Sequence, residues 1–120
     1  MKIKDIIEIL EAEVLFVQDN KQLDMEITSI AASDLMSTIL ALVNVPDLLL
    51  TGLNNSQVIN TASVFGIKVV AIIRNEEVDP KVLELAKKEG IILFLTEKCM
   101  YESCGLLYSK GLPCIYDKAH

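Results

Sequence analysis

Residues 66–95 read GIKVVAIIRNEEVDPKVLELAKKEGIILFL, and this stretch decides the fold. The apolar run Lys68–Arg74 predicts a buried strand. Asp79 then supplies a helix N-cap and is followed by proline at the first helical position, so a helix is predicted over Pro80–Glu89. Gly90 ends that helix in the left-handed conformation, and Ile91–Leu95 predicts the next strand. A strand, a helix and a second strand in this order imply a parallel pair with a right-handed crossover.

The same unit recurs on both sides of this stretch. Upstream, the apolar run Leu48–Thr51 predicts a fully buried strand, and Ser56–Phe65 predicts a helix that ends at Gly66. Downstream, Lys98–Lys110 predicts a helix that ends at Gly111. The helix-ending glycines lie 24 and 21 residues apart, which is the spacing of one strand plus one helix.

The N-terminal part of the chain predicts two further units of the same kind. A helix is predicted over Ile3–Glu11 from its apolar spacing, followed by a short strand, Val14–Val17. Ile27–Ala32 predicts another strand, after which Asp34 is expected to cap a helix that stops before Pro46. In the last helix, an apolar stripe is expected to face the core; it consists of Met100, Cys104, Leu107 and Tyr108.

Alternating strands and helices predict an α/β protein. The expected architecture is a three-layer α/β/α sandwich whose sheet of about five strands is mainly parallel or mixed. No linker rich in proline, glycine or serine divides the chain, so residues 1–120 are predicted to form a single domain.

Composition excludes several classes of protein. Hydrophobic residues make up 52% of the chain and charged residues 23%, which is typical of a folded domain. The net charge is −6 and no lysine and arginine cluster is present, so neither nucleic acid nor an anionic membrane is an expected partner. The chain shows no signal peptide and no membrane helix, which predicts a cytoplasmic protein, and its three cysteines are expected to be reduced thiols.

Ligands of parallel α/β sheets bind outside the carboxyl ends of the strands, and polar residues follow several of the predicted strands. The candidate ligand-binding residues at this rim are Asp34, Thr51, Gly52, Asn54, Asn55, Ser56, Arg74, Asn75 and Thr96. Glycine permits a close backbone approach, and the amide groups that begin the helix at Ser56 favour an anion. The alternative is a purely structural role, in which Gly52 forms a turn, and the aspartate and the asparagines only cap helices.

Catalytic motifs are missing from the sequence. Neither G-x-x-x-x-G-K-S/T nor G-x-G-x-x-G occurs, and His120, the last residue, is the only histidine. The cysteines match no known zinc spacing. The sequence therefore predicts a protein that is not an enzyme and has no metal or cofactor; an enzyme would need a carboxylate pair such as Asp34 with Glu97.

A family resemblance covers about residues 1–115. It is carried by four segments: ASDLMS at residues 32–37, LLLTGLNNSQV at 48–58, ELAKKEGI at 84–91 and MYESCG at 100–105. Together they resemble the DRTGG domain, which is similar to the N-terminal domain of HPr kinase/phosphorylase and also occurs in phosphotransacetylases and regulatory pyrophosphatases. Asp34 matches the acid that starts a helix in that family, and Gly52 is retained. Leu53-Asn54 replace the family's Asp-Arg, and Ile73-Arg74-Asn75 replace its Thr-Gly-Gly.

The resemblance implies a non-catalytic, often dimeric module that senses or relays a ligand, in some relatives an adenine nucleotide. Two hypotheses follow. In the first, the protein is a regulatory or ligand-sensing module that binds a nucleotide or a small anionic metabolite at the rim. In the second, it is a homodimeric interaction module without a small-molecule ligand, which docks a partner enzyme such as a kinase or a redox enzyme. The uncharged run Leu35–Pro46 motivates the second hypothesis, because it is more apolar than a small domain needs to bury.

Overall fold

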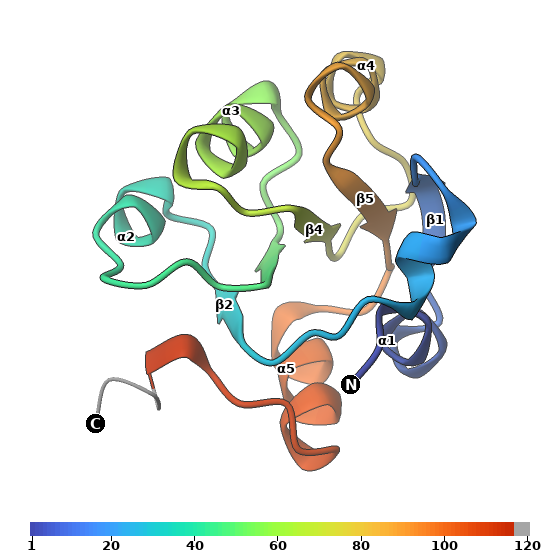
Figure 1. The fold of residues 1–120 in the computed structure, drawn as a ribbon, viewed down its shortest axis with the longest axis vertical. Coiled ribbons are helices and arrows are strands. Elements are labelled where there is room, and N and C mark those ends of the chain that lie inside the picture. Colours follow the sequence, from blue (N-terminus) through green and yellow to red (C-terminus); the bar gives the residue numbers. More distant parts are fainter. Residues whose placement is uncertain (117–120) are drawn as a thin grey trace.

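Figure 1 shows a computed structural model, which describes residues 1–116. Its sheet has five strands in the order β1-β5-β4-β3-β2. The bounds are Glu13–Phe16 for β1, Ile30–Ala32 for β2, Leu48–Thr51 for β3, Val69–Ile72 for β4 and Ile92–Leu95 for β5. Strands β2 to β5 are parallel neighbours, whereas β1 pairs with β5 in the antiparallel direction. The predicted mainly parallel, mixed sheet of an α/β protein is confirmed.

Helices cover both faces of this sheet (Figure 1). One face carries α2 (Met36–Leu40), α3 (Ser56–Phe65) and α4 (Pro80–Glu89). The other carries α1 (Ile3–Leu10) and α5 (Met100–Ser109). The predicted three layers are therefore present, and each face of the sheet has its own apolar core.

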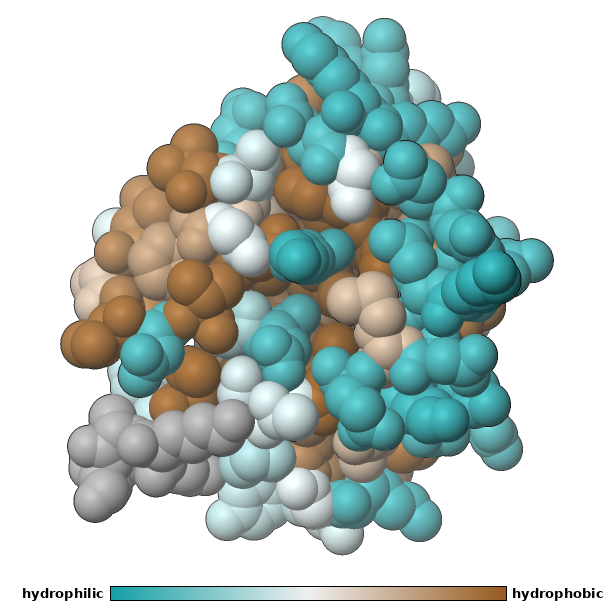
Figure 2. All heavy atoms as spheres, in the orientation of Figure 1, coloured by the Kyte–Doolittle hydropathy of each residue, from teal (hydrophilic) through white to brown (hydrophobic). Residues whose placement is uncertain are grey.

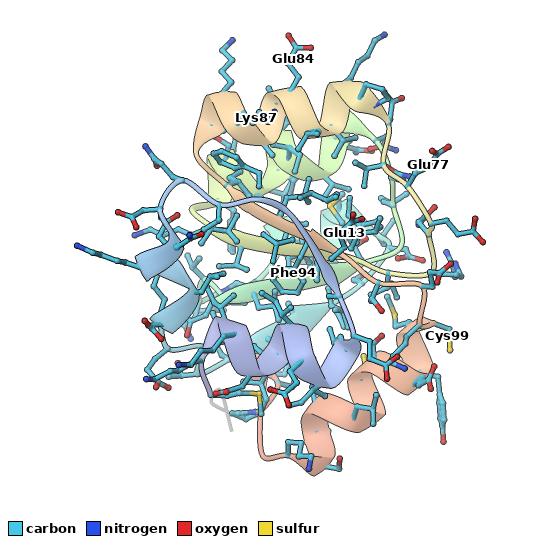
Figure 3. All side chains as sticks on the ribbon, turned by 90° about the vertical axis from the view of Figure 1, so that its right-hand side faces the viewer. Glu13, Glu77, Glu84, Lys87, Phe94 and Cys99 are labelled. Carbon is cyan, nitrogen blue, oxygen red and sulfur yellow. The ribbon has the colours of Figure 1, made fainter. Side chains whose placement is uncertain are left out.

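The three central strands are buried along their whole length, as their uninterrupted apolar sequences predict. Successive side chains point to opposite faces, so Leu93 joins the core under α2–α4 while Phe94 joins the core under α1 and α5. Figure 3 shows Phe94 inside the molecule beneath α1. Because both faces are covered, only the ends and edges of the sheet remain open to a ligand or partner.

The helix boundaries follow the predicted caps where a side chain or a glycine determines them. Asp79 accepts a hydrogen bond from the backbone N–H of Lys81 at the start of α4, and Asn55 accepts one from Gln57 at the start of α3. Gly66 and Gly90 have φ angles of +92° and +68° and end these two helices. Cap residues act through local hydrogen bonds, which is why the sequence alone locates them.

The prediction is wrong for the helix that follows β2. This helix, α2, covers only Met36–Leu40, and Leu35 occupies its N-cap position without a side-chain cap. Asp34 does not cap it, because the Asp34 carboxylate instead accepts hydrogen bonds from Thr51 and Gly52. Tertiary contacts thus remove the predicted cap.

Smaller differences occur near the N-terminus. The predicted strand from Ile27 begins only at Ile30, because the Ile27 N–H donates to the Met1 carbonyl 2.7 Å away and not to a neighbouring strand. Between β1 and β2 lies a 3₁₀ helix, Asn20–Asp24, which the sequence analysis did not predict. Helix α5 starts at Met100, two residues later than predicted.

Within residues 1–116, no helix is long and apolar enough to cross a membrane. His120 lies outside the described residues. The single-domain assignment of residues 1–120 stays a prediction.

Candidate functional site

The polar rim lies at the carboxyl ends of β2, β3 and β4, which are neighbours in the sheet. Here the chain leaves three parallel strands in succession at Ser33, Gly52 and Ile73. We define the rim cluster as Asp34, Thr51, Gly52, Asn54, Arg74 and Asn75, because a side-chain hydrogen bond or an ion pair joins each of them to another member.

Asp34 holds the β2 and β3 ends together. Its Oδ1 accepts a hydrogen bond from the Gly52 N–H at 2.6 Å and one from Thr51 Oγ1 at 3.3 Å. Its Oδ2 lies 3.5 Å from Arg74 Nη2. One carboxylate therefore connects the backbone after β3 with a cation that follows β4.

Arg74 has an unusual backbone conformation. Its φ is +61°, in the left-handed region that non-glycine residues rarely adopt, and its N–H donates to the Lys98 carbonyl at 2.9 Å. Its side chain is 59% exposed although it is paired with Asp34. The guanidinium thus faces solvent with donors to spare, since it carries five N–H groups and Asp34 is its single ion-pair partner among the described residues.

Gly52 is required by the position of that guanidinium. A Cβ atom at Gly52 would lie 2.7 Å from Arg74 Nη2, closer than real Cβ atoms come to a neighbour, and 3.2 Å from Asp34 Oδ1, which is a tight contact. Glycine therefore lets the arginine side chain lie directly against the backbone after β3.

Two asparagines extend the network toward α4. Asn54 Nδ2 donates to Asn75 Oδ1 at 3.4 Å and to the Glu77 carbonyl at 2.9 Å, and its Oδ1 accepts from the Asp79 N–H. Asn75 Nδ2 donates to the carbonyls of Ile73 and Gly52. These contacts fix the loops after β3 and β4 relative to each other.

Three of the predicted site residues lie outside the rim cluster. Asn55 caps α3, as its structural interpretation expects, and Ser56 is the first residue of that helix. Thr96 is buried; its Oγ1 donates to the Leu10 carbonyl at 2.7 Å and accepts from the Lys98 N–H. Its side chain thereby ties β5 to the end of α1, and only its backbone carbonyl meets the rim cluster, where it accepts the Asn75 N–H at 3.4 Å.

An acidic hollow that the sequence analysis missed lies beside the rim, at the end of β5. It has a volume of about 510 Å³ and is lined by Glu11, Glu13, Glu76, Glu97 and Glu102 together with Lys98. Lys98 Nζ lies 3.5 Å from Glu11 and 3.9 Å from Glu102. Figure 3 shows Glu13 at this end of β1. The five carboxylates come from segments that are far apart in the sequence, so no local sequence pattern predicts that they lie together. Their combined negative charge repels an anion.

The arrangement of the described side chains supports neither a metal site nor a catalytic pair of Asp34 with Glu97. Across residues 1–116, no group of three or more His, Cys, Asp or Glu side chains is arranged to hold a metal ion. Asp34 is paired with Arg74, while Glu97 lines the acidic hollow. The three cysteines are free thiols.

Comparison with known proteins places the chain in a family. The DRTGG domain matches residues 5–108, which is most of the chain. The chain belongs to the DRTGG domain family. A comparison with curated protein sequences finds no match.

A solved structure shares this DRTGG fold. It is the crystal structure of the CBS and DRTGG domains of the regulatory region of Clostridium perfringens pyrophosphatase, complexed with its activator, diadenosine tetraphosphate. The TM-score is 0.71 at 14% sequence identity. The match covers 96% of the present chain but only 49% of the pyrophosphatase chain, so this DRTGG domain spans about half of that structure.

Proposed function

We propose that this DRTGG domain is a non-catalytic regulatory module that senses a nucleotide at the rim cluster. The observation that carries the proposal is the exposed Arg74 guanidinium, held over Gly52 by Asp34. Arginine is well suited to phosphate because its planar fork of donors matches the phosphate oxygens. The left-handed backbone of Arg74 adds support, since such strain is often retained at functional sites.

The charges around Arg74 favour one direction from which a phosphate group would approach it. The N-terminus of α3 follows the rim cluster directly, and its backbone amides attract a negative charge. The acidic hollow lies on the other side, next to Asn75, and repels one. A phosphate would therefore approach between Arg74 and the start of α3.

The family supports the regulatory part of this proposal. The related pyrophosphatase region is regulatory and was crystallised with an adenine dinucleotide as its activator. By analogy, the DRTGG domain studied here would report the concentration of such a nucleotide to a partner enzyme in the cytoplasm, and would itself catalyse no reaction.

The test is a titration with diadenosine tetraphosphate and with ATP, followed by thermal unfolding and calorimetry. A ligand at 100 times its Kd stabilises a protein by about 2.7 kcal/mol, which raises the Tm of a domain of this size by several degrees. Arg74→Gln should lower the affinity at least tenfold, since a hydrogen bond to a charged group contributes about 1.5–3 kcal/mol. No binding of either nucleotide, or equal binding by the variant, would refute the proposal.

Lys87→Gln is the matched control, because it removes one positive charge elsewhere. Lys87 is exposed on α4 and points away from the molecule in Figure 3. Its loss changes the net charge as much as the loss of Arg74 does, yet it should leave nucleotide affinity almost unchanged.

A second function has a specific observation in its favour. Leu35, Leu40, Val43, Val45 and Val64 are exposed apolar side chains on α2, on the loop that follows it and on α3. Figure 2 shows apolar residues gathered on the left of the molecule, where Figure 1 places these helices. Residues 35–46 contain no charge, so two copies of an acidic chain can meet at this face without opposing like charges. This supports a homodimeric interaction module.

Light scattering after gel filtration tests the second function. Val43 and Val64 are 92% and 82% exposed, so Val43→Lys and Val64→Lys should preserve the fold and convert a dimer to a monomer. Val14→Lys makes the same change on β1, at the opposite edge of the sheet, and should leave the dimer intact. A wild-type monomer at a high micromolar concentration would contradict the dimer.

A further inference from the structure

A second hollow lies away from the rim cluster, between α5, the edge strand β2 and residues 112–116. It has a volume of about 580 Å³, within the range of small-molecule sites. We call it the tyrosine hollow, and its lining residues are Ile30, Ala32, Tyr101, Cys104, Gly105, Leu107, Tyr108, Leu112, Cys114 and Tyr116.

Among residues 1–116, no charged side chain lines the hollow, although 23% of the whole chain is charged. Two of its groups are free thiols, and burial raises the pKa of the Cys104 thiol, with the neighbouring Cys114 adding to the effect. The described walls therefore offer no charged partner to an ion, which favours an uncharged occupant.

All three tyrosines of the chain line this hollow. Tyr101 and Tyr108 remain 83% and 70% exposed, so their rings are available to a partner. They are seven residues apart on α5, about 10 Å along the helix axis at 1.5 Å per residue. Aromatic rings favour stacked or edge-to-face contacts with other rings, so these exposed tyrosines favour a ligand with a planar aromatic ring system.

Gly105 gives an independent indication of an occupant. It lies inside α5, where glycine is unfavourable relative to alanine. No atom of residues 1–116 explains it, because a Cβ at this position would meet none of them within 4 Å and Gly105 is not among the glycines with a positive φ. A methyl group there would project from the lining of the hollow, so the glycine keeps the helix backbone accessible to a ligand.

We propose that the tyrosine hollow is a binding site for an uncharged ligand with a planar aromatic ring system of about purine size. The proposal rests on the charge-free lining, the three tyrosines and the open helix-interior glycine. It does not depend on nucleotide binding at the rim cluster, which uses a cation and different loops.

The probe is adenosine, an uncharged nucleoside, with ribose as the comparison that lacks the ring system. In protein labelled with 3-fluorotyrosine, every ¹⁹F signal comes from the hollow, because the chain has no other tyrosine. Adenosine should shift all three signals with one common Kd, and ribose should shift none.

Gly105→Ala provides the decisive variant. It should raise the Tm of the free protein through better helix propensity, yet weaken adenosine binding at least tenfold. Ser109→Ala also places alanine in α5, at an exposed position outside the hollow, and should leave binding unchanged. Tyr108→Ala should weaken binding, and Tyr108→Phe should restore it by keeping the ring.

Separate outcomes distinguish this site from the rim cluster. Arg74→Gln should bind adenosine as the wild type does, even if it loses nucleotide affinity. The proposal is overturned if adenosine at millimolar concentration shifts no fluorotyrosine signal, if ribose produces the same shifts, or if Gly105→Ala binds adenosine as tightly as the wild type.

Discussion

The rim cluster and the tyrosine hollow meet in the chain, since Ala32 lines the hollow and Asp34 organises the rim two residues later. Their physical character nevertheless differs. The rim is built from hydrogen bonds to backbone groups and one exposed cation, whereas the hollow is an uncharged depression floored by apolar side chains. One short strand, β2, therefore borders two sites of different chemistry. Its carboxyl end leads into the rim cluster, whereas its outer edge meets residues 112–116, where the Ile30 N–H donates to the Pro113 carbonyl.

The largest expected effect is at the floor of the hollow. Leu107 is buried in the core under α1 and α5, so Leu107→Ala should lower the free energy of unfolding by about 2–5 kcal/mol, as core cavities do. Denaturant unfolding measures this. The neighbouring Leu106 is only half-buried, so Leu106→Ala should cost clearly less. Equal losses would mean that the floor is not part of the core.

A smaller effect is expected where a carboxylate holds the rim. Asp34→Ala removes the acceptor of the Gly52 N–H and the partner of Arg74, and should cost about 1–2 kcal/mol because the site is partly exposed. Asp34→Asn keeps an oxygen for the Gly52 N–H and should recover part of the loss. Thermal and denaturant unfolding of the three proteins decide the order; a fully stable alanine variant would show that the rim forms without the carboxylate.

Gly52→Ala tests whether position 52 needs glycine for the close approach of the Arg74 side chain to the backbone, and not for the stability of the fold. The added methyl group collides with the end of the flexible Arg74 side chain, which can move, so the free energy of unfolding should fall by less than about 1 kcal/mol. Nucleotide affinity should fall nearly as far as in Arg74→Gln, while adenosine binding in the hollow stays unchanged. Calorimetry on both ligands measures the contrast, and a loss at both sites would break the separation of the two regions.

The smallest expected effect concerns the rates at which the cysteine thiols are chemically modified. The raised pKa of Cys104 leaves less thiolate at pH 8, so iodoacetamide should modify Cys104 more slowly than the exposed Cys99, which Figure 3 shows near the start of α5. Raising the pH further should increase the Cys104 rate as its thiolate forms. Bound adenosine should lower the rate at which iodoacetamide modifies Cys104 and leave the rate at Cys99 unchanged. Peptide mass spectrometry gives the rates, and faster labelling of Cys104 than of Cys99 would contradict a sheltered thiol.

Local patterns predicted the framework correctly. The apolar runs at β3, β4 and β5, the N-cap Asp79 and the positive-φ glycines Gly66 and Gly90 act within a few residues of themselves, so sequence reasoning could identify them. The order β1-β5-β4-β3-β2 was not predicted, because pairing joins segments that are far apart in the chain.

The candidate site was predicted only in part. Parallel strands bring their carboxyl ends to one edge, which is why residues 34, 51, 52, 54, 74 and 75 were selected together. The cap assigned to Asp34 was wrong, since its carboxylate is used by Gly52 and Arg74. The stripe on α5 was wrong at Tyr108, which faces solvent at the hollow while Leu107 is buried.

The α/β alternation and most of the helix ends could be inferred from the sequence, because they depend on periodicity and on local hydrogen bonds. The resemblance to the DRTGG family rested instead on particular sequence motifs, and the match to the family over residues 5–108 confirms it. Only the tertiary structure decided that Asp34 pairs with Arg74 over Gly52, that five glutamates from distant segments share one hollow, and that three tyrosines share another. Each of these depends on contacts between residues widely separated in the chain, which form only when the sheet is assembled.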